Sequence, residues 1–170
     1  MAVKCYNVIK TMYEKEYSVM LDHFYGISLT YITNKNGEVV SSNPEPFMML
    51  NLPIPHIKNI TLQDCINLYC QDEVLEGENM WYNEKTKEKE VVTKKTKFWS
   101  FPKILIIDLK RFNNNNSKRQ ELIKIPVEEI LNLTSYIYGY NSESYKYRLY
   151  AVCNHEGGVL GGHYTATVKK

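Results

Sequence analysis

The sequence predicts an α+β fold, with two helices early in the chain and an antiparallel-rich sheet later. Two segments before residue 74 carry apolar residues at helical spacing, whereas most later apolar segments alternate with polar residues or are rich in β-branched residues. The chain has 170 residues, enough for one domain that buries about 70% of its unfolded surface. It contains no evident internal repeat or domain linker.

Composition and charge restrict the class of protein. Apolar residues make up 44% of the chain and charged residues 24%, as in ordinary soluble globular proteins. The 21 basic and 19 acidic residues give a formal charge of +2, without the clustered basic face of a nucleic-acid-binding protein. No apolar run approaches the roughly 18 residues of a membrane helix, and the N-terminal residues lack a signal-peptide core. We therefore expect no nucleic-acid or membrane partner, a location in the cytoplasm or nucleus, and four reduced, mostly buried cysteines.

The first predicted helix covers residues 5–24. Its apolar face follows the i, i+3, i+4, i+7 pattern at Cys5, Val8, Ile9 and Met12 and continues at Val19, Met20 and Phe24. Gly26 is expected to end this helix. Two strands are then expected around the turn signal Asn36-Gly37, and the prolines at 44, 46, 53 and 55 favour extended backbone after them.

The second predicted helix covers residues 61–73. Thr61 followed three residues later by Asp64 is a capping-box pattern. One face of this helix is expected to carry Leu62, Cys65, Ile66 and Tyr69.

The second half of the chain reads mainly as strands. Residues 76–98 interleave charges of both signs and predict a solvated β arm, whereas KILIIDLKRF after Pro102 predicts a strand buried on both faces. The NNNN run at 113–116 predicts a polar loop, and IPVEEILNL fits either a strand or a short helix. The last two segments, SYKYRLYAVCNH and GGHYTATVKK, predict alternating strands joined across a glycine-rich loop.

His163 is the first candidate for chemistry. A neutral imidazole can take a proton from a thiol near neutral pH, and Gly161 and Gly162 leave space beside it for an extended substrate backbone. The alternative is a glycine-rich hairpin with an incidental histidine at a strand start. His155 is expected on the neighbouring strand, but no third ligand is placed beside the two histidines, so metal binding is not expected.

No nucleophile is evident from the residues themselves. Cys153 lies two residues before His155 and is expected on the same strand face, while Cys5 lies near the start of the first helix. Each of these cysteines also fits a buried core position. Cys65 and Cys70 are expected to point apart on the second helix, and Gly-x-Ser-x-Gly, phosphate-loop and dinucleotide motifs are absent from the sequence.

Short sequence blocks are spread over nearly the whole chain, in the order FYG, EPF, LPIP, TLQDC, EGENMWY, FPKILIIDLKRF, YRLYAVCNHEGG and GGHYTA. This order resembles that of the ubiquitin-specific proteases, the papain-like cysteine deubiquitinases. The resemblance implies a papain-like fold of the ubiquitin-specific protease type, with the fingers and palm present and the thumb missing. Residues 1–170 then correspond to the C-terminal half of the catalytic domain.

The resemblance also implies a reaction. In this family a cysteine thiolate attacks the carbonyl after the ubiquitin C-terminal Gly-Gly and an isopeptide bond is cut, with a histidine as general base and an Asn or Asp orienting it. His163 matches the base. Four further residues match positions that line the channel for the ubiquitin tail: His155, Gly161, Gly162 and Tyr164. The expected partners are ubiquitin and ubiquitinated proteins.

Two features depart from the family pattern. The Gly-Asn-Thr-Cys box is absent, so Cys5 is interpreted as a helix residue and the nucleophile is expected outside this chain. The zinc-binding Cys-x-x-Cys pairs of many members are replaced by ITNKNG and YNEKTK, which predicts no metal or other cofactor and fingers held by packing and strand pairing alone.

Three hypotheses follow from the resemblance. The chain is part of a deubiquitinase truncated at both ends, a catalytically dead relative that binds ubiquitin, or a structural domain that has lost both roles. Under the first hypothesis the chain expressed alone is expected to aggregate, because the apolar faces that meet the thumb are uncovered. It is also expected to be inactive on ubiquitin-AMC, because the Cys box and the block with the orienting Asn or Asp are absent from these 170 residues.

Overall fold

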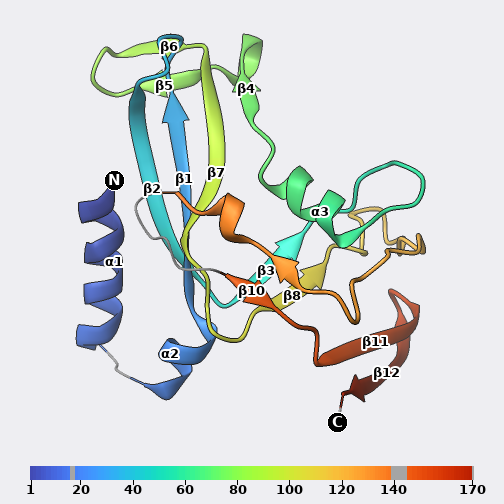
Figure 1. Ribbon diagram of the computed structural model, residues 1–170. Coiled ribbons are helices and arrows are strands. Elements are labelled where there is room, and N and C mark those ends of the chain that lie inside the picture. The colour runs from blue at the N-terminus through green and yellow to red at the C-terminus, as the bar shows by residue number, and fades with distance from the viewer. Residues whose placement is uncertain (16–17, 139–144, 170) are drawn as a thin grey trace. The chain divides into compact units, whose positions relative to one another are not determined.

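The computed structural model describes residues 1–15, 18–138 and 145–169. It is rich in strands with few helices, as the sequence predicts (Figure 1). The chain forms two compact units, each assembled from three separate segments. Unit 1 contains residues 1–50, 70–106 and 135–143, and unit 2 contains residues 51–69, 107–134 and 144–170. Because the segments alternate along the chain, no single linker separates the units.

Unit 1 is built on a four-stranded antiparallel sheet. Its strand order is β2-β1-β7-β4, with bounds β1 (Gly26–Thr33), β2 (Val39–Phe47), β7 (Val92–Ser100) and β4 (Glu73–Leu75). The expected turn at Asn36-Gly37 joins β1 to β2, and the Gly37 N–H donates to the Asn34 carbonyl at 3.0 Å. Pro44 and Pro46 lie in β2. Because β2 is an edge strand, it tolerates proline, which has no N–H group to donate to a neighbouring strand.

The first predicted helix is two helices in the structure. These are α1 (Ala2–Lys15) and α2 (Val19–Phe24). The predicted helix also included residues 16–17, which lie outside the described ranges. Val19 and Met20 are exposed, so the apolar face does not continue into α2 as expected. The expectation that Gly26 ends the helix is also wrong. Gly26 opens β1, where a β-carbon would lie 2.6 Å from the Ser100 carbonyl oxygen.

The core of unit 1 lies between α1 and the sheet. Cys5 of α1 is fully buried against Leu29 and Tyr31 of β1, and α1 runs beside β2 (Figure 1). A second buried group consists of aromatic rings: the Phe98 centroid lies 4.3 Å from that of Phe101 and 5.5 Å from that of Phe47. Burial of these rings supplies much of the hydrophobic stabilisation of the sheet.

The last part of the predicted arm, residues 92–98, belongs instead to β7, where Val92 and Phe98 are buried, so the prediction of a solvated arm is wrong there. The charged residues from 76 to 91 form the β arm, as predicted. It contains η1 (Gly77–Asn79), β5 (Trp81–Asn83) and β6 (Glu88–Glu90), and β5 pairs with β6. Two asparagines hold the turns in ITNKNG and YNEKTK, the segments that the resemblance places where many members carry zinc-binding pairs. Asn34 Oδ1 accepts from the backbone N–H groups of Asn36 and Glu38, each at 3.0 Å, and Asn83 Oδ1 accepts from that of Lys85 at 3.0 Å. Packing and strand pairing are therefore not alone in holding the fingers, because asparagine side chains also organise both turns.

Asn83→Ala is expected to destabilise the protein by about 1–3 kcal/mol, because it removes two side-chain hydrogen bonds, each worth about 0.5–1.5 kcal/mol. Asn83 is 8% exposed, and its Nδ2 donates to Glu90 Oε1 at 2.8 Å. The free energy of unfolding in urea measures the effect. Asn34→Ala, in the more exposed turn, is the matched comparison and should cost less; equal small losses for both variants would contradict the role of Asn83.

Unit 2 contains α3 (Leu62–Tyr69), which confirms the second predicted helix but ends four residues earlier than expected. The capping box is present: Asp64 Oδ2 accepts from the Thr61 N–H at 2.8 Å and from the Thr61 hydroxyl at 2.6 Å, which lowers the pKa of Asp64. Of the four residues predicted on one face of α3, Leu62, Cys65 and Ile66 are buried, whereas Tyr69 is only half-buried. Cys70 lies beyond the end of the helix.

The remaining strands correct two expectations. KILIIDLKRF forms only the short strand β8 (Ile106–Leu109), paired with β3 (Met49–Leu52), and its residues are half-buried except for exposed Asp108. No residue of β8 is fully buried and Asp108 is exposed, so the prediction of burial on both faces is wrong. IPVEEILNL contributes only β9 (Leu131–Asn132), paired with β10 (Lys146–Tyr147), and η2 (Thr134–Tyr136) follows it. Among the described residues no helix is long and apolar enough to cross a membrane.

Candidate functional site

The candidate site is a hairpin in unit 2 formed by β11 (Ala151–Gly158) and β12 (Gly161–Val168). This confirms two paired strands joined across the glycine-rich loop. The first predicted strand, SYKYRLYAVCNH, is however divided: residues 146–147 form β10, which pairs with β9, and β11 begins only at Ala151. His155 is opposite Tyr164 in the antiparallel register, and Glu156 is opposite His163. Opposed residues share a face and successive residues alternate, so the two histidines lie on neighbouring strands but on opposite faces.

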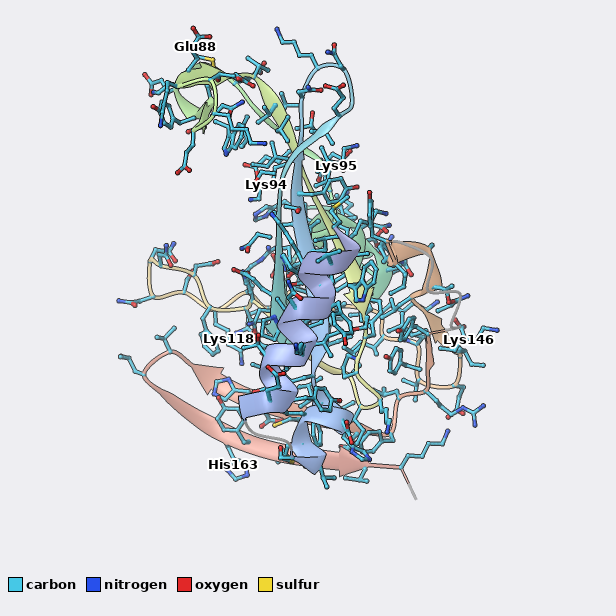
Figure 2. All side chains as sticks on the ribbon, turned by 90° about the vertical axis from the view of Figure 1, so that its left-hand side faces the viewer. Glu88, Lys94, Lys95, Lys118, Lys146 and His163 are labelled. Carbon is cyan, nitrogen blue, oxygen red and sulfur yellow. The ribbon has the colours of Figure 1, made fainter. Side chains whose placement is uncertain are left out.

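His163 lies on the outer face of the hairpin with its side chain exposed. In Figure 2, Lys118 and His163 lie on opposite sides of the hairpin ribbon. Cys153 lies two residues before His155 and opposite Ala166, so it shares the face of His155, as predicted, and not that of His163. The hairpin therefore separates this thiol from the candidate base.

His155 is half-buried and held on several sides. Its Nδ1 lies 2.9 Å from the Lys118 ammonium nitrogen, and its ring centroid lies 4.6 Å from that of Tyr164 and 5.6 Å from that of Phe112. Of the predicted channel residues, the structure thus brings His155 and Tyr164 into contact on one face, while His163 points away from them.

Two glycines permit this arrangement. Gly157 has φ +116°, and a β-carbon there would lie 2.6 Å from the Gly161 carbonyl oxygen. A β-carbon on Gly162 would overlap with the Glu156 carbonyl oxygen and with Nε2 of His155. Gly162 is therefore required by contacts within the hairpin itself. At Gly161, in contrast, no atom lies within 4 Å of the place that a β-carbon would occupy. This is compatible with the prediction that a substrate backbone passes there.

Lys118 is a residue of this site that sequence reasoning missed. It follows the NNNN loop, in which the Asn113 N–H donates to the Ser117 carbonyl at 2.9 Å and the Ser117 hydroxyl donates to Asn115 Oδ1 at 2.6 Å. Phe112 and Lys118 form an antiparallel bridge across this loop. No local pattern marks Lys118, because its contacts are with residues almost forty positions later.

The cysteines do not provide a nucleophile beside His163. Cys5 and Cys65 are fully buried, and burial raises the pKa of each thiol. Burial also raises the pKa of Cys70, to about 11, so little of it is thiolate at neutral pH. Cys153 is exposed, which corrects the expectation of a core position for it. Within the described ranges, no three His, Cys, Asp or Glu residues are grouped closely enough to hold a metal ion.

Comparison with known proteins identifies the family. The model of the family "Ubiquitin carboxyl-terminal hydrolase" matches residues 5–170, almost the whole chain. The chain belongs to this family. The resemblance to the ubiquitin-specific proteases, based on the order of the sequence blocks, is thereby confirmed.

The relatives that the chain matches are much longer. Ubiquitin carboxyl-terminal hydrolase 4 of Eremothecium gossypii is 31% identical over 171 residues, covering 91% of this chain and 20% of that protein. Ubiquitin carboxyl-terminal hydrolase Usp2 of Drosophila melanogaster is 39% identical over 128 residues, covering 74% of this chain and 13% of that protein. The chain thus spans about a fifth or less of the length of these two relatives.

Solved structures of ubiquitin hydrolase modules have the same fold. A SAGA DUB module, Ubp8/Sgf11/Sus1/Sgf73, bound to monoubiquitin matches with a TM-score of 0.77 at 22% identity, over 91% of this chain and 35% of that chain. The same module bound to ubiquitin aldehyde matches with a TM-score of 0.75 at 21% identity, over 97% of this chain and 40% of that chain. The α+β fold of the ubiquitin-specific protease type is therefore confirmed.

Proposed function

We propose that the chain is part of the catalytic domain of a cysteine deubiquitinase, which hydrolyses the isopeptide bond after the C-terminal Gly-Gly of ubiquitin. Membership of the ubiquitin carboxyl-terminal hydrolase family supports the reaction class. The fold is shared with modules whose structures hold monoubiquitin or ubiquitin aldehyde, which supports ubiquitin as the partner.

The observation that carries the assignment of the base is the exposed imidazole of His163, on a strand that begins with two residues lacking side chains. In the proposed reaction His163 takes the proton of a cysteine thiol, and the thiolate attacks the carbonyl carbon of the terminal glycine. The imidazolium then protonates the departing lysine amine as the carbon–nitrogen bond breaks. Water, deprotonated by the same imidazole, hydrolyses the thioester and restores the thiol.

The nucleophile in this proposal is a cysteine outside these 170 residues. Cys5 and Cys65 are inaccessible, and the raised pKa values of their thiols and of Cys70 oppose the thiolate form at neutral pH. Cys153 is accessible but lies on the hairpin face opposite to His163. Ubiquitin would then lie with its extended tail against His155, Gly161, Gly162 and Tyr164.

Covalent labelling tests the proposal directly. The protein expressed from its complete transcript is incubated with ubiquitin that carries a thiol-reactive group at its C-terminus, and the labelled cysteine is located by mass spectrometry. We expect one label on a cysteine outside the 170 residues. A label on Cys5 or Cys153 would contradict the assignment of the nucleophile, and ubiquitin binding without any label would favour the catalytically dead, ubiquitin-binding alternative.

A further inference from the structure

The ammonium group of Lys118 contacts three hydrogen-bond acceptors, all of them in β11. Its ammonium nitrogen lies 2.7 Å from the carbonyl oxygen of His155, 2.9 Å from Nδ1 of the same residue and 3.2 Å from the carbonyl oxygen of Gly157. An ammonium group has three N–H donors and no acceptor, so these three β11 atoms match its donors one to one. The lysine is half-buried, which strengthens such charge-assisted bonds.

This contact decides which ring nitrogen of His155 carries the proton. Because Lys118 can only donate, Nδ1 must accept, and the neutral ring then carries its proton on Nε2. Nε2 is the ring atom that faces Gly162, where a β-carbon would overlap with it. The ring is thus fixed at one nitrogen by Lys118 and lies against the β12 backbone at the other.

The ring of His155 contacts β12 on both sides of the candidate base. Gly162 precedes His163 and is covered by the ring edge, while Tyr164 follows His163 and has its ring centroid 4.6 Å from that of His155. A displacement of the His155 ring would therefore be transmitted to the two residues that flank His163 in the strand.

Lys118 is itself held in place by its neighbours in sequence. It forms the bridge with Phe112 across the NNNN loop, and its ammonium lies 5.9 Å from the Phe112 ring centroid. The next residue, Arg119, is nearly buried and donates to the carbonyl oxygens of Ile54 and Pro55 and to the Glu121 carboxylate. These contacts hold the backbone of Lys118 in place, and its side chain extends from there to the hairpin.

We propose that Lys118 is a positioning residue: it holds His155 in the Nε2–H tautomer, with the Nε2 edge of the ring against Gly162, and so fixes the strand segment that carries His163. The tautomer can be tested without reference to catalysis. The effect on turnover rests on the proposed function, with His163 as the base.

The first test is the ¹⁵N NMR spectrum of histidine-labelled protein at pH 8.5. We expect a single Nε2–H tautomer for His155, a mixture of tautomers in Lys118→Met, and recovery of the single tautomer in Lys118→Arg. Lys124→Met is the matched control, since the Lys124 side chain is exposed in the same unit. An unchanged tautomer in Lys118→Met would overturn the proposal.

A measurement on the unsubstituted protein makes the test independent of whether the variants fold. The ammonium protons of Lys118 are expected to exchange with water more slowly than those of Lys124, because three acceptors hold them. Equal exchange rates would overturn the proposal.

The kinetic test uses ubiquitin-AMC and the protein expressed from its complete transcript. Lys118→Met is expected to lower kcat by about 10- to 100-fold, because misplacing a catalytic group by about 1 Å can cost two orders of magnitude. Lys118→Arg should recover most of the rate, and KM should change little. An altered tautomer with unchanged kcat would overturn the link to His163. If the unsubstituted protein has no turnover, the proposed function fails, while the tautomer and exchange measurements still decide the role of Lys118.

Discussion

His163→Gln is expected to reduce turnover of ubiquitin-AMC by about 10²- to 10⁴-fold, the usual contribution of a general acid–base group. Glutamine has a similar size and keeps hydrogen-bonding atoms, but it cannot accept the thiol proton near neutral pH. The side chain of His163 is exposed, so the variant should fold and unfold like the parent protein. The loss should therefore appear in kcat and not in the free energy of unfolding.

His56→Gln is the matched control for this variant. His56 is also exposed and also belongs to unit 2, but it lies outside the hairpin. Its replacement should leave turnover within a factor of about two, as expected for a surface change of less than 0.5 kcal/mol. Turnover by His163→Gln equal to that of His56→Gln would exclude His163 as the base.

Gly162→Ala is expected to have the second-largest effect, a loss of kcat of about 100-fold. The added methyl group would overlap with the Glu156 carbonyl oxygen and with His155 Nε2, so the ring or one of the two strands must move. Overpacking of this kind costs about 1–3 kcal/mol, and a displacement of about 1 Å beside a catalytic group can cost 10²-fold in rate. The steady-state rate on ubiquitin-AMC and the free energy of unfolding in urea measure the two consequences.

Gly158→Ala provides the comparison on the same hairpin. Nothing lies within 4 Å of a β-carbon placed at Gly158, so the same chemical change meets open space. Its effect on kcat should be less than about threefold, in line with a surface substitution. If the two alanine variants have equal activity, steric contact at Gly162 does not set the position of His163.

The elements marked by local signals could be predicted from the sequence. The turn at Asn36-Gly37, the Thr61–Asp64 capping box and the hairpin around the glycines all depend on residues close together in the chain, and all three are present. His163 could be identified as the candidate base for the same reason, because the glycines and the tyrosine beside it form one continuous run of residues.

The predictions that failed depended on tertiary partners. The β-branched run at Ile106 predicts a strand covered on both faces, but its residues are half-buried or exposed, because the run does not specify which elements pack on each face. Val19 and Met20 have the correct helical period yet lie exposed, because period does not specify what packs against a face. Lys118 has ordinary neighbours, and only its contacts with β11 give it a role.

The alternating segments of the two units have a consequence for synthesis on the ribosome. β1 pairs with β2 directly after it in the chain, but its other neighbour, β7, ends at Ser100. At about 5–20 residues per second, roughly 4–15 seconds separate the emergence of Gly26 from that of Ser100. During that interval one edge of the apolar segment GISLTYIT has no partner strand, and such an edge can pair with another chain. The nascent protein should therefore depend on chaperones most strongly before β7 emerges, and a codon-level slowing within residues 48–91 should lower the soluble yield more than the same slowing after residue 107.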